Sequence, residues 1–291
     1  MNAKEIDFVT HPQETHWVGD GFRVHNFIPE VSGMSQHEMD PFILLDYNSK
    51  MHVEGGSQRG VGVHPHRGFS TVTFAYHGKV AHHDSTGHGG VIGEGDVQWM
   101  TAARGVLHKE YYEKEWASKG GDFQMVQLWV NLPSYAKMQE PSYQAVTRED
   151  MGKYLLPDDS GVVEVVSGRY KDVTGPAQSK TPVHLLNVRL NNSGKANFSF
   201  PEHYTTALIV VEGSVEVNGV EVMLDNLLKF KRSGEDFEIK ATSPNTVVLV
   251  MSGEPLNEPI VSYGPFVMNS RAEIAQAFTD FGNGMFGKLG D

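Results

Sequence analysis

One succession of strand, glycine, second strand and turn occurs twice along this chain. The runs TVTFAYHG at residues 71–78 and ALIVVEG at residues 207–213 are rich in β-branched and aromatic side chains, and both end at a glycine. The first run continues into Val80–His82, which we expect to pair with it as a hairpin. Each repeat then reaches a turn with an aspartate, at residues 95–98 and 224–228. This repetition predicts a mainly all-β chain with two similar β-barrels or jelly rolls in tandem.

Two short clusters in the first repeat place metal-ligand side chains two residues apart. They are HPH at residues 64–66 and HKE at residues 108–110. Successive side chains of a β-strand point to opposite faces, so residues two apart share a face. On two facing strands, the clusters would direct three imidazoles and one carboxylate to a common point. Such a donor set suits a divalent Fe, Ni, Cu, Mn, Co or Zn ion.

The composition excludes several classes of protein. The 291 residues can form one large or two medium domains. The formal charge of −12 argues against a nucleic-acid surface, which requires clustered Lys and Arg. The absence of cysteine excludes disulfides, thiolate metal sites and thiol catalysis. No run has the apolar character of a signal peptide or a membrane span, so we expect a cytoplasmic, soluble protein, by default a monomer.

The remaining histidines are given less weight. His82, His83 and His88 lie in and beside a glycine-rich loop, where exposed side chains are the common case, although they could support the metal site from outside the ligand set. His203 is expected at the surface or in a hydrogen bond. Arg67 follows the first cluster and should point away from the metal, where it orients a carboxylate, closes the pocket or pairs at the surface.

The repeat also indicates what stands at the ligand positions of the second barrel. Matching the two glycines places the first cluster on Ser199 and Pro201, and matching the two aspartates places the second cluster on Phe237 and Ile239. These side chains do not form a ligand set, so we expect the second barrel to be metal-free.

A helix is expected near the end of the chain. Ser270 and Glu273 have capping-box spacing. Four apolar residues then follow at helical spacing: Ile274, Ala277, Phe278 and Phe281. Gly282 suits the position after the helix, and the tail at residues 282–291 is expected to fray.

These features define four expected parts of the chain. Pro141 and Pro157 lie in a stretch that we interpret as a linker between the two halves. The expected parts are an N-terminal metal-binding barrel at residues 1–135, a linker region at 136–160, a metal-free second barrel at 161–265, and a C-terminal helix and tail at 266–291.

The two clusters belong to longer blocks that closely resemble the pirin family of the cupin superfamily. The blocks are HPHRGF from residue 64, GDVQWMTAARGVLHKE from residue 95, QLWVNL from residue 127, EPSY from residue 140, EPLNEP from residue 254 and GPFVMN from residue 264. They span most of the chain. The resemblance implies a two-cupin fold whose N-terminal barrel holds one Fe through His64, His66, His108 and Glu110. In one departure, Ser70 stands where family members often carry Glu, so the surroundings of the site are expected to differ.

The resemblance also implies an activity. Members of the family are associated with quercetin 2,3-dioxygenase activity and, in eukaryotes, with transcriptional co-regulation. We therefore expect an Fe²⁺ enzyme that binds a small planar flavonol and cleaves it with O2. Glu110 would be the catalytic base that accepts the 3-hydroxyl proton. Two alternatives stay open. One is an iron-dependent redox sensor that binds a regulatory protein, and the other is a cupin enzyme acting on another small enol-type metabolite.

Overall fold

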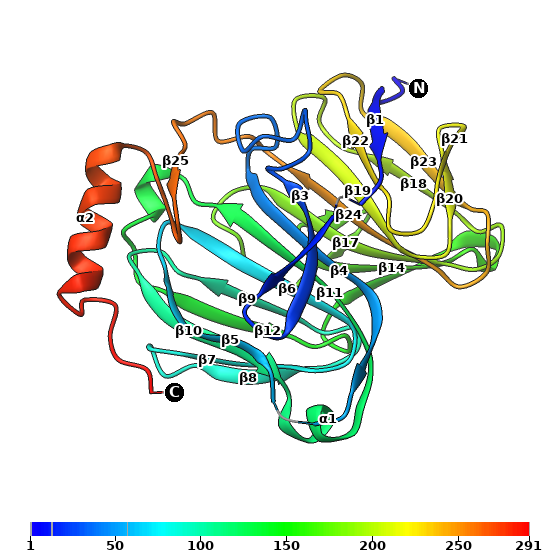
Figure 1. Cartoon of the computed structure of the whole chain (residues 1–291). Coiled ribbons are helices and arrows are strands. Elements are labelled where there is room, and N and C mark those ends of the chain that lie inside the picture. The colour runs from blue at the N-terminus through cyan, green and yellow to red at the C-terminus, as the bar shows by residue number, and fades with distance from the viewer. Residues whose placement is uncertain (1, 13, 57, 291) are drawn as a thin grey trace. The chain divides into compact units, whose positions relative to one another are not determined.

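The computed structural model describes residues 2–12, 14–56 and 58–290, and over these ranges the chain consists mainly of β-strands with two α-helices (Figure 1). The helices are α1 (Lys114–Lys119), which was not predicted, and α2 (Arg271–Gly282). The predicted mainly all-β fold with a C-terminal helix is confirmed. In the described ranges, no helix combines the length and apolar character needed to cross a membrane.

The chain forms two compact units. Of the described residues, the first unit comprises 14–56, 58–147 and 256–290, and the second comprises 2–12 and 148–255. In the first unit, the described residues form a sheet in the order β12-β9-β6-β11-β4-β3-β2, a smaller sheet in the order β5-β10-β7-β8, and the ribbon β25-β26. These strands are β2 (Thr15–Val18), β3 (Phe22–Ile28), β4 (Phe42–Glu54), β5 (Gly60–His66), β6 (Phe69–His77), β7 (Val80–Asp84), β8 (Gly89–Ile92), β9 (Val97–Thr101), β10 (Val106–Tyr112), β11 (Gly120–Asn131), β12 (Ser142–Val146), β25 (Val261–Tyr263) and β26 (Phe266–Met268).

The second unit has the same kind of architecture. Its described residues form a sheet in the order β1-β22-β19-β24-β17-β14-β13, a smaller sheet in the order β18-β23-β20-β21, and the ribbon β15-β16. These strands are β1 (Ile6–Thr10), β13 (Gly152–Leu156), β14 (Gly161–Ser167), β15 (Arg169–Tyr170), β16 (Val173–Thr174), β17 (Val183–Leu190), β18 (Lys195–Ser199), β19 (Thr205–Glu212), β20 (Val215–Val217), β21 (Val220–Val222), β22 (Leu227–Phe230), β23 (Asp236–Ala241) and β24 (Thr246–Gly253).

The two units repeat one strand order. In the larger sheets, β9, β6, β11 and β4 stand in the same succession as β22, β19, β24 and β17. In the smaller sheets, β5-β10-β7-β8 corresponds to β18-β23-β20-β21. The repeated pattern in the sequence therefore reflects a real duplication of architecture, as predicted.

The predicted hairpin between the first run and Val80–His82 is wrong. The first run forms β6, which pairs with β9 and β11, whereas β7 pairs with β8 and β10 in the smaller sheet. Gly78 is the corner at which the chain leaves one sheet for the other. Its φ is +80°, and a Cβ there would lie 2.7 Å from the Phe123 ring, which explains the glycine in physical terms.

The boundaries of the two units differ from the expected ones. The expected linker carries β12, which pairs with β9, and β13, which pairs with β14, so each half of it belongs to a sheet. At the start of the chain, β1 pairs with β22 and therefore belongs to the second unit rather than to the first. An exposed sheet edge can pair with any strand that reaches it, and that strand need not be close to it in the sequence.

Helix α2 begins as expected, and one residue of the tail after it packs in the interior. The Ser270 hydroxyl accepts a hydrogen bond from the backbone amide of Glu273, the first half of a capping box. Ile274 and Ala277 are buried. Beyond the helix, Phe286 is buried, and its carbonyl accepts a hydrogen bond of 2.5 Å from the Ser85 hydroxyl. The expectation of a frayed tail is therefore wrong at Phe286, which packs in the first unit, while most of the other described tail residues are exposed. Asp291 lies outside the described residues.

Candidate metal centre

The strands that carry the two predicted clusters are neighbours in the smaller sheet of the first unit. His108 on β10 lies directly opposite His64 on β5, and Val106 lies opposite His66. Alternate residues of β10 are buried, namely Val106, His108, Glu110 and Tyr112. One face of a single strand thus carries two ligand-type side chains between two apolar ones, as the spacing of the second cluster predicted.

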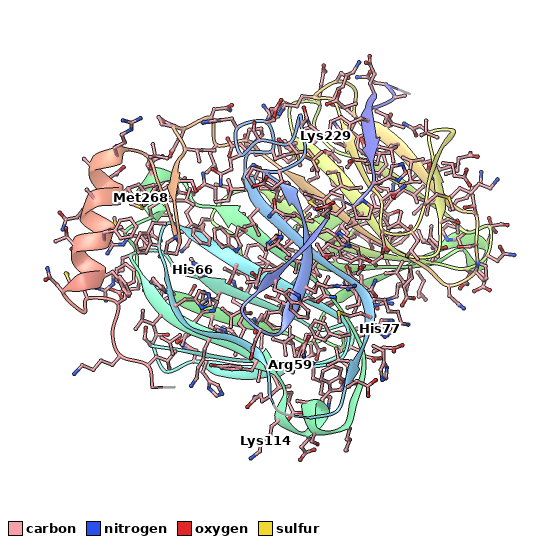
Figure 2. The ribbon with its side chains drawn as sticks, in the orientation of Figure 1. Arg59, His66, His77, Lys114, Lys229 and Met268 are labelled. Atoms are coloured by element: carbon pink, nitrogen blue, oxygen red, sulfur yellow. The ribbon has the colours of Figure 1, made fainter. Side chains whose placement is uncertain are left out.

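The three predicted histidines meet inside this unit. Ligand atoms of His64, His66 and His108 all lie within 4.8 Å of one another. Their ring centroids are 4.2 Å apart for His64 and His108, and 4.8 Å apart for each of the other two pairs. His66 and His108 are buried and His64 is half-buried. Figure 2 shows His66 among the packed side chains of the unit.

Two of these rings have a backbone partner for their Nδ1 atom. Nδ1 of His64 lies 2.8 Å from the carbonyl oxygen of Gly62, and Nδ1 of His66 lies 3.4 Å from that of Pro265. A carbonyl can only accept, so both rings carry their hydrogen on Nδ1 and present the lone pair of Nε2. Metal-binding histidines are typically oriented in this way.

The Nε2 atom of His108 is the clearest sign that a ligand belongs here. It is buried, and among the described residues it has no hydrogen-bond partner. A buried polar atom without a partner is costly, and a bound cation would remove that cost. The residues therefore fit a divalent transition metal.

The two buried histidines, His66 and His108, have the protonation state that metal binding requires. Burial lowers the pKa of His66 and of His108 well below the usual value, and repulsion from the neighbouring His64 ring lowers it further. A buried imidazole near other imidazoles is therefore neutral at physiological pH and has a lone pair available.

Glu110 faces the same interior, with its carboxylate held by amides. Its Oε1 accepts a hydrogen bond of 2.5 Å from Nε2 of Gln98, and its Oε2 accepts one of 2.8 Å from Nε2 of Gln127. The Thr73 hydroxyl donates a further bond of 3.3 Å. Glu110 groups within 4.8 Å with His82 and His108, rather than with the first two histidines. The four predicted ligands thus form two overlapping groups that share His108.

The sequence interpretation named His82 only as a less favoured supporting residue of this site. It was expected in an exposed loop, but it is fully buried on β7, opposite Glu110 on β10. Its Nδ1 lies 3.4 Å from Nδ1 of His108, and its Nε2 lies 3.4 Å from Oδ2 of Asp84. Alternation along VAHHD at residues 80–84 could have revealed it. His83 and His88 are exposed, as expected.

Ser70 does not take part in the surroundings of Glu110. Its hydroxyl lies 2.9 Å from Oγ1 of Thr101. The residue of the same strand that does reach Glu110 is Thr73, three positions further along and therefore on the opposite face. The departure from the family pattern at this position therefore leaves the carboxylate's hydrogen bonds intact.

Arg67 is buried and tied to the C-terminal helix. Its guanidinium forms an ion pair of 2.8 Å with Asp280 of α2 and lies 4.7 Å from the centre of the Phe286 ring. Its Nε donates a 2.6 Å hydrogen bond to the Arg104 carbonyl. Of the three expected roles, it therefore orients a carboxylate, and it does so in the interior.

The equivalent positions in the second unit carry apolar side chains. Phe198 lies opposite Phe237 in the pair β18–β23, as His64 lies opposite His108 in β5–β10. Phe200 and Ile239 follow at the equivalents of His66 and Glu110. The second cluster was matched correctly, but the match of the first to Ser199 and Pro201 was one residue out of register. A one-residue slip moves a side chain to the opposite face.

Comparisons with known proteins agree with this architecture. Residues 21–130 match the family model "Pirin", and residues 185–287 match "Pirin C-terminal cupin domain". A Pseudomonas aeruginosa protein named "Putative quercetin 2,3-dioxygenase" is 47% identical over 93% of this chain and 94% of its own length. A crystal structure named quercetin 2,3-dioxygenase, from Acinetobacter baumannii, superimposes with a TM-score of 0.91 at 43% identity, covering 99% of both chains.

A more distant structure shares the fold. An Escherichia coli pirin crystallised with nickel(II) has a TM-score of 0.65 at 20% identity, covering 85% of this chain and all of that one.

Proposed function

This chain belongs to the pirin family, and from that membership we propose that it is a metal-dependent dioxygenase that cleaves quercetin-like flavonols with O2. The observation that carries the proposal is the buried, unpartnered Nε2 of His108, in the described part of the chain, between the histidine pair of β5 and the carboxylate of Glu110. Relatives of this chain are named for the same activity.

His64, His66, His108 and Glu110 would hold the ion. All of them supply nitrogen or oxygen donors, which suit Fe²⁺ and also the other divalent ions from Mn to Zn. We propose iron as the physiological metal, with nickel as the first alternative because a relative of the same fold was crystallised with it. A transition ion held there supplies a Lewis acid and a template for a hydroxy-ketone and O2.

Glu110 is the residue that would move the proton. Its carboxylate would accept the 3-hydroxyl proton of the flavonol, acting as the general base. The amides of Gln98 and Gln127 hold one oxygen each. This orientation is fixed before the substrate arrives, so little reorganisation is needed at the moment of transfer.

Aromatic side chains pack against His66. The rings of Phe69 and Trp129 stack with centroids 4.1 Å apart, and each lies 5.0 Å from the His66 ring. An apolar wall of this kind strengthens electrostatic interactions beside His66.

The test combines elemental analysis of freshly purified protein with an aerobic quercetin assay that detects carbon monoxide. We expect about one transition metal per chain and metal-dependent turnover. His66→Ala should lose both. Glu110→Gln should retain the histidines but lower turnover by about 10²- to 10⁴-fold, the range typical of a lost general base. Glu216→Gln, at an exposed position of the second unit, is the control and should match wild type.

Two results would contradict the proposal. Quercetin cleavage by protein that contains no metal would exclude the proposed site. A metal-loaded protein that binds the ion through these residues but never releases carbon monoxide would instead favour a sensor, or an enzyme acting on another enol-type metabolite.

A further inference from the structure

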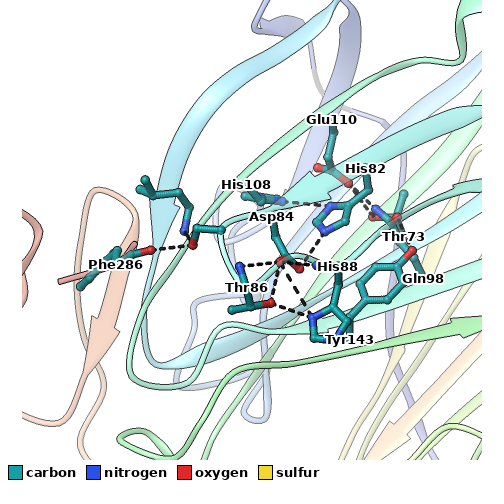
Figure 3. A network of polar contacts seen from close by, with 12 residues as sticks. Thr73, His82, Asp84, Thr86, His88, Gln98, His108, Glu110, Tyr143 and Phe286 are labelled. Atoms are coloured by element: carbon teal, nitrogen blue, oxygen red, sulfur yellow. Dashed lines mark hydrogen bonds and ion pairs between the residues drawn. The ribbon is translucent and has the colours of Figure 1, made fainter. Parts of the chain in front are cut away.

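The three histidines of the candidate centre differ in what orients them. Backbone carbonyls occupy the Nδ1 side of His64 and His66. On His108 the same position is taken by another imidazole, that of His82, at 3.4 Å. His82 is fully buried, and a carboxylate, that of Asp84, lies at 3.4 Å on its far side. The succession His108–His82–Asp84 is visible in Figure 3.

The direction of the hydrogen bonds from His108 to His82 and from His82 to Asp84 follows from the carboxylate of Asp84. An ionised carboxylate can only accept, so His82 carries its hydrogen on Nε2. A neutral His82 ring then has a bare Nδ1, which accepts from Nδ1–H of His108. The neutral His108 ring is consequently bare at Nε2, the atom that lacks any partner among the described residues.

Asp84 is itself held firmly in an ionised state. Its Oδ1 accepts hydrogen bonds from the amide of Thr86 at 2.9 Å, the hydroxyl of Thr86 at 2.6 Å and the amide of His88 at 3.1 Å. Although burial acts to raise the pKa of Asp84, hydrogen bonds from His82, Thr86 and His88 keep it below the usual value.

The middle ring of the succession is held in place by stacking. Tyr143 on β12 stacks on His82 with centroids 5.0 Å apart and an interplanar angle of 13°. The Tyr143 hydroxyl donates a 3.4 Å hydrogen bond to Gln98, the amide that holds Glu110. One aromatic residue therefore contacts the supports of two candidate ligands (Figure 3).

We propose that His82 and Asp84 are positioning residues that fix the tautomer of His108, so that its Nε2 lone pair faces the metal. The inference rests on the metal centre of the proposed function, but not on the reaction carried out there. It assigns to His82 the task that a backbone carbonyl performs for each of the other two histidines. Partners of this kind typically contribute about 10- to 100-fold to metal affinity.

Asp84→Asn is the sharpest variant. The amide oxygen can keep the three bonds that Oδ1 accepts from the loop, while the amide nitrogen faces His82 and donates to it. This reverses both hydrogen bonds and moves the hydrogen of His108 to Nε2. We expect zinc(II) affinity, measured by chelator competition at one neutral pH, to fall about 10- to 100-fold. The ¹⁵N spectrum of the metal-free protein should show His108 changing from the Nδ1–H to the Nε2–H form.

His82→Phe is the second variant, and His83→Phe is its matched control. The phenyl ring introduced by His82→Phe would keep the stacking on Tyr143 but leave Nδ1 of His108 without an acceptor, so zinc affinity should fall. His83 is the exposed neighbour on the same strand, and its substitution should leave affinity unchanged. X-ray absorption should count three imidazole ligands on zinc in wild type and in all three variants. If His82 and Asp84 only supported the fold, the substitutions would not change the ¹⁵N signal of His108 while zinc kept three imidazole ligands.

Three results would overturn the inference. Unchanged affinity and an unchanged His108 spectrum in Asp84→Asn would show that the succession does not orient the ring. Loss of one imidazole from the zinc sphere in His82→Phe would show that His82 is itself a ligand. Failure of wild-type protein to bind zinc or iron would remove the metal centre and the inference together. Metal binding without flavonol cleavage would contradict only the dioxygenase function.

Discussion

Buried polar side chains of the first unit obtain their partners from distant parts of the chain. The carbonyl that orients His66 belongs to Pro265, 199 positions away, and the carboxylate that pairs with Arg67 belongs to Asp280, 213 positions away. Local spacing therefore predicts which atoms share a face, but not which ring nitrogen remains bare. His82 shows the same limit, since its burial depends on the neighbouring β10.

Asp46 gives a prediction at this scale. It is buried on β4, and its Oδ1 accepts a 2.6 Å hydrogen bond from Asn26. Burial raises its pKa from 3.8 to about 6. Between pH 3.8 and about pH 6, Asp46 is deprotonated in the unfolded chain but still protonated in the folded chain. The free energy of unfolding therefore falls as the pH rises through this range, and the full cost is present above about pH 6. That cost is on the order of 2–3 kcal/mol at neutral pH.

Asp46→Asn should remove this cost. We expect urea unfolding to show a more stable variant than wild type at neutral pH and nearly equal stabilities in acid, near the unfolded-state pKa. Equal stability differences at both pH values would contradict the assignment, because the charge of Asp46 would then not be responsible.

At the scale of elements, alternation of side chains was predictable, whereas pairing between strands was less so. The spacing in β10 predicted one buried face, and the capping pattern predicted the start of α2. The β6–β7 hairpin was wrong because the corner at Gly78 sends the chain into another sheet. The same residue types end a strand whether the chain turns back as a hairpin or crosses to another sheet. Only the strands that pair on either side of the corner distinguish these two cases.

Lys137 is a buried lysine that connects several elements of the first unit through hydrogen bonds. Its side chain is buried, and its Nζ donates to the carbonyls of Gly68 and Val267, at 2.7 and 3.0 Å, and to Oδ1 of Asn131 at 2.7 Å. It thus links the end of β11 and the turn after β5 to strand β26. Burial lowers its pKa to about 8, and it is still mainly charged at neutral pH.

Lys137→Met should destabilise the protein by about 3 kcal/mol, because three buried acceptors lose a charged donor. Thermal unfolding at neutral pH measures the effect. Lys114→Met, on α1 in an exposed position (Figure 2), is the control and should change stability by less than about 0.5 kcal/mol. Similar losses in both variants would contradict the role of Lys137.

At the scale of the whole molecule, one strand order supports two different interiors. The small sheet of the first unit places His64 opposite His108, whereas that of the second places Phe198 opposite Phe237, with ring centroids 5.0 Å apart. Within the second unit, the N-terminal strand β1 completes the edge of the larger sheet at β22.

Deletion of residues 2–10 should therefore weaken the second unit and spare the metal centre. Removal of β1 exposes the backbone of β22 and uncovers apolar side chains beneath it, so the unit should unfold at lower temperature and aggregate more readily. Calorimetry should show the shift while metal content per folded chain stays at the wild-type value. Loss of metal in the deleted protein, with an unshifted transition, would be the contradictory result.

The all-β architecture, its duplication and the chemical identity of the candidate ligands could all be predicted from the amino-acid sequence. These properties follow from side-chain periodicity and residue type, which are local. Three features became evident only in the folded chain: β1 completes the larger sheet of the second unit, Phe286 of the tail packs in the first, and His82 lies beside His108 and Asp84. These features depend on contacts between segments far apart in the chain, where the free energy of packing and of satisfied hydrogen bonds selects the partner.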